Sequence, residues 1–89
     1  MTVRDNTALG RFELEEKGLT VFANYRRHGE HVVIPHVEAA PPLRGTGAAE
    51  RLMAGIVELA RRDDFKIAPT CSYARLWFRR HRDAADVLA

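Results

Sequence analysis

The sequence predicts a small α/β domain with a mixed, α+β-like sheet, in which antiparallel strands 1–3 precede a parallel β-α-β crossover and a C-terminal helix. Three observations support this. Polar and apolar residues alternate in the first half, one long helical pattern occupies the middle, and a glycine-containing loop directly precedes that helix. The 89 residues suffice for one core but not for two, so residues 1–89 are expected to form a single domain.

Composition narrows the class of protein. The 46% hydrophobic and 29% charged fractions are ordinary for a globular domain, and no apolar run approaches the roughly 20 residues that cross a bilayer. No membrane partner is therefore expected. The N-terminus lacks an apolar signal core, and the single cysteine, Cys71, has no internal disulfide partner. These features favour a reducing, cytoplasmic location.

The first predicted element is an antiparallel hairpin. Residues 1–10 are polar and weakly patterned, so they are expected to be a partly flexible lead-in, with regular structure beginning at Arg11. Polar and apolar residues alternate over 11–15 and over 19–25, which predicts two strands. Glu16, Lys17 and Gly18 supply the turn between them, because glycine readily takes a positive φ.

A third strand is predicted over residues 31–39, after a turn at residues 28–30. Its alternation places Val32, Ile34, His36 and Glu38 on one face, and Val33, Pro35 and Val37 on the other. Pro35 donates no ladder hydrogen bond, so it predicts an edge position, a bulge or a local parting of strands. Main-chain groups left open there could be satisfied by a ligand that contains amides.

A long helix is predicted from about Thr46 to Arg62 and a fourth strand over residues 65–71. The predicted buried face of the helix consists of Ala49, Leu52, Met53, Ile56, Val57, Leu59 and Ala60. A connection of this length implies a parallel, right-handed crossover. Ser72 is the expected N-cap of a last helix over residues 73–81. Its buried candidates are Leu76, Trp77 and Phe78, and residues 83–89 form a short tail.

The loop from Pro41 to Ala49 has the properties of an anion-binding cradle. Gly45 and Gly47 let the backbone approach a ligand closely, and the unpaired N–H groups and dipole of the following helix favour negative charge. The alternative is a tight strand-to-helix turn that binds nothing.

Residues 44–49, Arg-Gly-Thr-Gly-Ala-Ala, fit the Arg/Gln-x-x-Gly-x-Gly/Ala signature of the GCN5-related N-acetyltransferases. With His36-Val37-Glu38 before this loop and residues 69–73 after the fourth strand, the chain resembles the minimal single-domain, YjdJ-type branch of that superfamily over residues 12–81. The resemblance implies the minimal acyl-CoA N-acyltransferase (GNAT) fold. It also implies an enzyme that transfers acetyl from acetyl-coenzyme A (acetyl-CoA) to a primary amine.

The resemblance implies a set of cofactor-binding residues and no metal site. The pyrophosphate would be held by Arg44, Gly45, Thr46, Gly47, Ala48 and Ala49, with further cofactor contacts from Val37, Tyr73 and Arg79.

Three residues are candidates for catalysis. His36 could accept the amine proton, although a lone histidine on a strand is usually a packed group, and Glu38 could orient it. Cys71, at a helix start that lowers a thiol pKa, could be a nucleophile, an acid or a pocket wall. Tyr73 is a rival acid for the thiolate, or a packing residue.

Two departures from the family pattern keep an alternative open. Val37 replaces the usual threonine, and Ala39-Ala40 stand where Val-Pro is common. A non-catalytic acyl-CoA-binding module is therefore the second hypothesis. The acceptor and the oligomeric state are not indicated, although so short a chain leaves an open site that suits a peptide or protein amine.

The arginines of the last helix and tail form the one basic group in the sequence: Arg75, Arg79, Arg80 and Arg82. They are either a solvated helix face or a contact for cofactor phosphates or an acidic partner. Nucleic acid is the least favoured partner, because no recognised binding motif is present.

Overall fold

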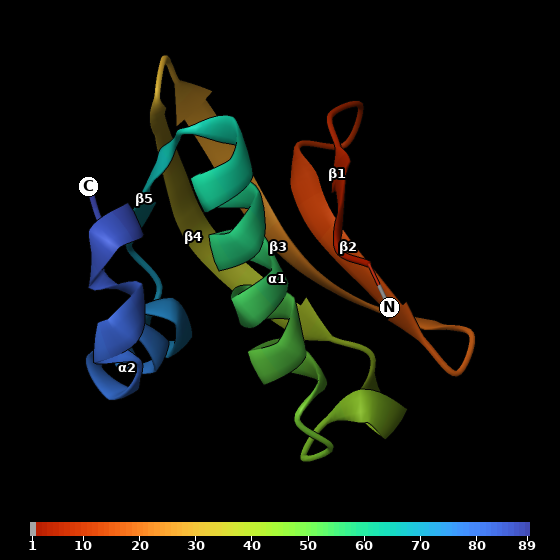
Figure 1. Cartoon of the computed structure of the whole chain (residues 1–89). Coiled ribbons are helices and arrows are strands. Elements are labelled where there is room, and N and C mark those ends of the chain that lie inside the picture. The colour runs from red at the N-terminus through yellow and green to blue at the C-terminus, as the bar shows by residue number, and fades with distance from the viewer. Residues whose placement is uncertain (1) are drawn as a thin grey trace.

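A computed structural model describes residues 2–89 and shows a five-stranded mixed sheet with two α-helices (Figure 1). The strands are β1 (Arg4–Asn6), β2 (Arg11–Glu16), β3 (Leu19–His28), β4 (His31–Ala39) and β5 (Lys66–Pro69), and they lie in that order across the sheet. Neighbouring strands are antiparallel except β4 and β5, which are parallel. The predicted fold class is confirmed.

The predicted hairpins are present. Lys17 and Gly18 join β2 to β3, and both have positive φ angles, 53° and 73°. Such mirror-image turns match the right-handed twist of the strands that they connect. Gly29, with a φ of 63°, lies in the turn between β3 and β4.

The prediction that regular structure begins at Arg11 is wrong. β1 pairs with β2, with Arg4 opposite Glu13. Glu13 is buried and accepts hydrogen bonds from the side chains of Arg4, Arg11 and Asn6. β1 was missed because it is only three residues long, and because paired charges rather than an apolar face hold it in place.

Val3, directly before β1, is buried against α1. A Cβ built on Gly55 of α1 would lie 2.1 Å from Val3 Cγ2. The N-terminal segment therefore packs on the helix at a point where only glycine leaves room.

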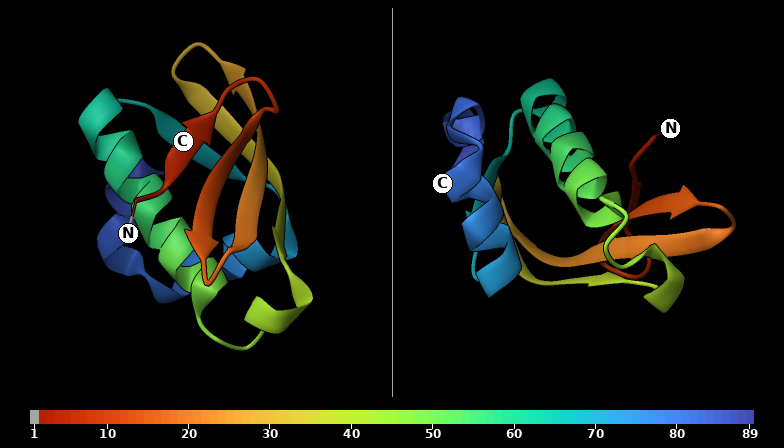
Figure 2. Two further views of the ribbon diagram at one scale, coloured as in Figure 1. Left: turned by 90° about the vertical axis from the view of Figure 1, so that its right-hand side faces the viewer. Right: turned by 90° about the horizontal axis from the view of Figure 1, so that it is seen from below.

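Helix α1 (Ala48–Asp63) crosses one face of the sheet (Figures 1 and 2). It begins two residues later than predicted, because Gly47 is its N-cap with a left-handed φ of 85°. Its buried residues are Ala48, Leu52, Met53, Ile56, Val57 and Ala60. Burying this face against the sheet removes a large apolar area from water and supplies most of the core.

Helix α2 (Ser72–Arg80) lies beside the sheet edge formed by β5 (Figure 2). Its N-cap is Cys71 and not the predicted Ser72, because the cysteine Sγ accepts the N–H of Ala74 at 3.4 Å. Trp77 and Phe78 are buried as predicted, whereas Leu76 is 40% exposed.

The predicted C-terminal tail is part of the packed structure. Residues Arg82–Val87 form a short 3₁₀ helix, η2, in which Ala84 and Val87 are buried. Beyond it, the N–H of Ala89 donates to the carbonyl of Ile67 at 2.8 Å and so extends the β5 edge.

Candidate functional site

Strands β4 and β5 form a fork. Their ladder ends at the pair Ile34 and Pro69, after which β4 continues to Ala39 while the other chain turns into α2. The carbonyl oxygen of Ile34 accepts the N–H of Thr70 at 3.1 Å and that of Cys71 at 3.4 Å. The Thr70 hydroxyl donates to the same oxygen at 3.3 Å. These three hydrogen bonds fix the point at which the strands part.

A β-bulge lies beside this point. The pairing of β3 with β4 shifts register between Asn24 and Arg26, so that Ile34 and Pro35 lie opposite Tyr25 alone. The disturbance predicted at Pro35 is confirmed. Because the proline has no N–H, the extra residue leaves no main-chain donor unpaired.

Beyond the bulge, one set of main-chain groups points into the fork. The N–H of Ala40 donates to the carbonyl of Thr20 on β3 at 3.2 Å. Main-chain groups alternate in direction along a strand, so the N–H and C=O of Val37 point to the opposite edge, from which β5 has departed. This is the open edge that the sequence predicted for an amide-containing ligand.

His36 and Glu38 lie together on the arm of the fork formed by β4. The distance from His36 Nε2 to Glu38 Oε1 is 3.0 Å, and each side chain is about half exposed, at 50% and 51%. The His36 ring lies 6.3 Å from that of Phe22, which alternates with the fully buried Val21 and Ala23. The pair therefore projects from the sheet face opposite α1, where solvent has access. The prediction that it shares a face with Val32 and Ile34 is wrong, because those two side chains are buried and the bulge reverses the alternation after them.

The loop before α1 has the small, turned backbone that an anion cradle needs. Gly45 and Gly47 both have left-handed φ angles, 76° and 85°, and a Cβ on Gly45 would meet nothing within 4 Å. Arg44 Nε donates to the carbonyl of Ala39 at 3.3 Å, which ties the loop to the end of β4.

One predicted donor of the cradle is already engaged. The N–H of Thr46 donates to the carbonyl of Leu43 at 3.2 Å, and its hydroxyl donates to the same oxygen at 2.6 Å. Among residues 2–89, no main-chain acceptor pairs with the remaining predicted donors, the N–H groups of Gly45, Gly47, Ala48 and Ala49. Four of the five predicted donors therefore have no main-chain partner, and Ala48 is the one of these four that is buried, at 1% exposure.

Arg51 links the cradle loop to the end of β2. Its guanidinium donates to both carboxylate oxygens of Glu16 at 2.7 and 2.8 Å and to the carbonyl of Thr46 at 3.1 Å. A Cβ on Gly47 would lie 2.9 Å from Arg51 Nη1. Hydrogen bonding to Arg51 lowers the pKa of Glu16, so the brace is charged at neutral pH. The sequence carried no signal of it, because the partners are 35 positions apart.

Tyr73, in the first turn of α2, faces the start of α1. A cavity of about 110 Å³ between the two helices is lined by Glu50, Tyr73, Leu76, Trp77, Arg80 and His81. Burial raises the pKa of Tyr73, and the charges of Glu50 and Cys71 raise it further. The phenol is therefore protonated at neutral pH.

A second contact, not foreseen from the sequence, joins these helices. His81 Nε2 lies 3.2 Å from Glu50 Oε1, and the His81 ring stacks on Trp77 with a centroid separation of 3.9 Å. This contact connects the C-terminal end of α2 to the start of α1.

Arg79 is not brought to this cavity. It lies on another side of α2 and lines a separate hollow with Arg75, whereas Arg80 lies on the side that faces α1. The predicted site residues thus form a loop at the start of α1 and two arms of a fork, one carrying His36 and the other Cys71 and Tyr73. Residues 2–89 contain no group of three or more His, Cys, Asp or Glu side chains that could hold a metal ion.

Comparison with known proteins gives a match to a family model and matches to solved structures. Residues 11–87 match the family model of the GCN5-related N-acetyltransferases. The fold is similar to the NMR solution structure of a GCN5-like putative N-acetyltransferase from Staphylococcus aureus, with a TM-score of 0.71 and 22% identity over 98% of this chain and 86% of that one. No curated protein matches the sequence. Among residues 2–89, no helix has the length and apolar character that a bilayer crossing requires.

Proposed function

We propose, from the premise that this chain belongs to the GCN5-related N-acetyltransferase family, that it binds acetyl-CoA and transfers the acetyl group to a primary amine. The observation that carries the proposal is the fork. A loop suited to phosphate lies at the end of β4, and the gap between β4 and β5 opens beside it with Cys71 on its far arm. A long ligand with phosphates at one end and a reactive group at the other fits this arrangement.

The cradle supplies the phosphate contacts. The available N–H groups of Gly45, Gly47, Ala48 and Ala49 and the positive end of the α1 dipole stabilise negative charge there. Arg44 adds a full positive charge at the loop. The main-chain N–H and C=O of Val37 offer a donor and an acceptor to the amides of the cofactor arm. Arg79 is left out of this set because it lies in a separate hollow.

The arms of the fork supply the acid–base chemistry. Bound acetyl-CoA provides a thioester carbonyl carbon that a neutral amine can attack. His36 accepts the proton that the amine loses, and its contact with Glu38 fixes the orientation of the ring. Tyr73 donates a proton to the departing thiolate, and its raised pKa keeps the phenol protonated at neutral pH.

Cys71 is compatible with two roles. Its Sγ accepts the N–H of Ala74 at the start of α2 and lies at the arm of the fork opposite β4. It would then carry the acetyl group covalently between cofactor and amine, or else line the gap without reacting. Mass spectrometry after incubation with acetyl-CoA separates these roles, because only the first gives an acetyl adduct on Cys71.

The first test is cofactor binding. Acetyl-CoA is expected to raise the melting temperature and to shift the amide NMR signals of Gly45, Gly47, Ala48 and Ala49. The signal of Thr46 should move less, because its N–H already has a partner. If neither the melting temperature nor these signals change, cofactor binding is wrong.

The second test is turnover. Release of the coenzyme thiol in the presence of an amine library is expected to fall in His36→Ala and in Tyr73→Phe, with the affinity for acetyl-CoA retained. His28→Ala is a matched control, because His28 is an exposed histidine at the far end of β3. A non-catalytic acyl-CoA-binding module is the second candidate, favoured by Val37 in place of threonine. It is the correct one if the cofactor binds but no amine releases the thiol.

A further inference from the structure

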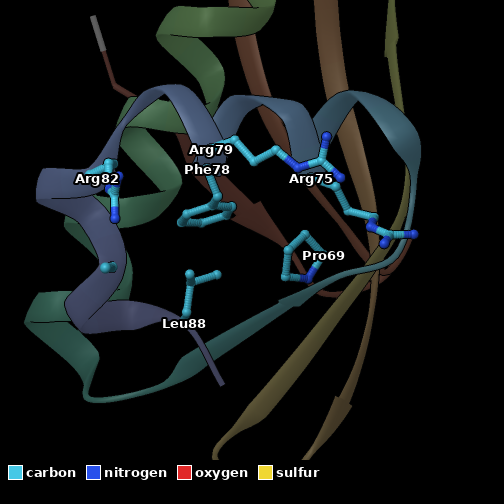
Figure 3. Close-up of a pocket in the computed structure, with 7 residues that line it drawn as sticks. Pro69, Arg75, Phe78, Arg79, Arg82 and Leu88 are labelled. Carbon is cyan, nitrogen blue, oxygen red and sulfur yellow. The ribbon is translucent and has the colours of Figure 1, made fainter.

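A hollow of about 770 Å³ lies between α2, η2 and the end of β5 (Figure 3). Its floor is apolar and its rim is basic. The apolar lining residues are Pro69, Phe78, Ala85 and Leu88, and the basic ones are Arg75, Arg79 and Arg82. In Figure 3, Phe78 and Leu88 point toward each other across the floor, and Pro69 at the end of β5 lies beside them. We call this hollow the arginine groove.

The three arginines of the groove have no acidic partner within residues 2–89. No carboxylate of the described chain lies within ion-pair distance of them, whereas Arg61 and Arg62 on α1 pair with Asp86 and Asp63. Asp86 belongs to η2, as Arg82 does, but it is held by Arg61 at 2.9 Å. The negative charge that would complement the groove must therefore come from another molecule.

The groove continues toward the reactive end of the fork. A second hollow of about 200 Å³ is lined by Ser72, Arg75, Leu76 and Arg79, so it shares Arg75 and Arg79 with the groove. Ser72 follows Cys71 directly at the start of α2. The two hollows together extend from Leu88 to Ser72, the residue that follows the cap of α2.

The shape and chemistry of the groove favour a peptide. It is open to solvent, whereas sites for small molecules usually enclose most of the ligand. Guanidinium groups bind carboxylates with paired hydrogen bonds, and the apolar floor suits the methylene groups and apolar neighbours of acidic side chains. A single-stranded nucleic acid would need exposed rings for stacking, but Phe78 is only 6% exposed.

We propose that the arginine groove docks an acidic segment of a protein acceptor and presents a nearby amine at the start of α2. The presentation of the amine rests on the acetyltransferase function proposed above, whereas the docking itself does not. The chain would then prefer amines that lie near Asp and Glu residues over amines in neutral or basic surroundings.

The test is fluorescence anisotropy with a labelled peptide of Glu, Asp and Leu residues around one lysine. The control peptide has the same sequence with Gln and Asn in place of the Glu and Asp residues. The variant Arg79→Glu/Arg82→Glu reverses two charges at the rim, and Arg26→Glu is the matched control, because Arg26 is an exposed arginine of β3 outside the groove. Circular dichroism checks that each variant folds.

The wild-type chain is expected to bind the acidic peptide, more weakly as salt is added, and the neutral peptide at least about tenfold more weakly. The double variant should lose at least about tenfold in affinity for the acidic peptide, and Arg26→Glu less than about twofold. The affinity for acetyl-CoA should be the same in all three proteins.

Several results would overturn the proposal. If both peptides bind with the same affinity, the chain does not recognise acidic side chains. If the double variant binds the acidic peptide as tightly as the wild type does, the groove is not the binding site. A double variant that loses acetyl-CoA instead would show that the groove holds the cofactor. An oligonucleotide that binds there more tightly than the peptide would identify a nucleic-acid surface.

The experiments can refute the docking proposal and the proposed function independently of each other. If the acidic peptide binds the groove but acetyl-CoA does not bind the chain, docking stands and the acetyltransferase function is wrong. If acetyl-CoA binds and amines release its thiol while the acidic peptide fails to bind, the function stands and docking is wrong.

Discussion

Replacement of Gly55 by alanine should destabilise the protein, although alanine is the better helix former. In an exposed helix interior this change gains about 1 kcal/mol. Here the new Cβ would lie 2.1 Å from Val3 Cγ2 and 2.8 Å from Val3 Cβ, so the N-terminal segment must move away from α1. Exposing a buried valine costs about 1.5–3 kcal/mol. The net loss in the free energy of unfolding is therefore about 0.5–2 kcal/mol.

The sign should reverse when Val3 is first replaced by glycine. In the Val3→Gly background no side chain opposes the new Cβ, so Gly55→Ala should recover its ordinary gain of about 1 kcal/mol. A double-mutant cycle isolates this coupling from the separate effects of each change. For a domain of this size 1 kcal/mol corresponds to about 4–8 °C in melting temperature, so thermal denaturation followed by circular dichroism resolves both signs.

The reasoning is refuted if Gly55→Ala raises the melting temperature of the otherwise unchanged chain. That result would mean that residues near Val3 do not pack on α1 in solution. Equal effects of Gly55→Ala in both backgrounds would be just as damaging, since they would show that the two residues do not interact.

Three further predictions concern the cradle, the proposed acid and the buried carboxylate. Gly45→Ala and Gly47→Ala should each lose about 1–2 kcal/mol of unfolding free energy in urea denaturation, because both glycines have left-handed φ angles. Gly47→Ala should lose more, since its Cβ also displaces Arg51; an equal loss would contradict the contact. Tyr73→Phe should lower kcat without changing the KM for acetyl-CoA, and because the pKa of Tyr73 is raised, the wild-type rate should not fall through ionisation of this phenol below pH 10. Hydrogen bonds from Arg11 and then Arg4 lower the pKa of Glu13 below 4.5, so the unfolding free energy should fall as the pH drops below 4.5; Glu13→Gln should show a smaller fall, and an unchanged acid profile would count against the pairing.

The parts of the fold that the sequence predicts are those that depend on local pattern. The alternation over β2 and β3, the apolar repeat of α1 and the positive-φ glycine at position 18 each act within a few residues, and the structure contains all three elements. The bulge beside Pro35 was also predictable, because proline lacks a ladder donor. β1 and η2 were missed because partners distant in sequence hold them in place: the Glu13 ion pairs for β1, and Arg61 and the core for η2.

The residues of the candidate site show the same difference between local pattern and long-range packing. Loop residues such as Gly45 and Gly47 were identified from their type and position. Strand alternation put His36 and Glu38 on a shared face, but it assigned them the wrong side of the sheet, because the bulge beside Pro35 reverses the alternation. Arg51, which braces the cradle, could not be identified, because its partner Glu16 lies on another element. The position of Arg79 depended on which side of α2 meets α1, a property of packing that the apolar pattern of so short a helix did not fix.

The opening of the fork has a consequence for mutational tolerance. It is set by main-chain atoms, since the Ile34 carbonyl ends the parallel ladder and Pro35 lacks a hydrogen to continue it. Side chains beyond that point can therefore change during evolution without closing the gap. Val37 in place of the family's threonine is such a change: its side chain packs against the core, while its main-chain groups still point into the opening.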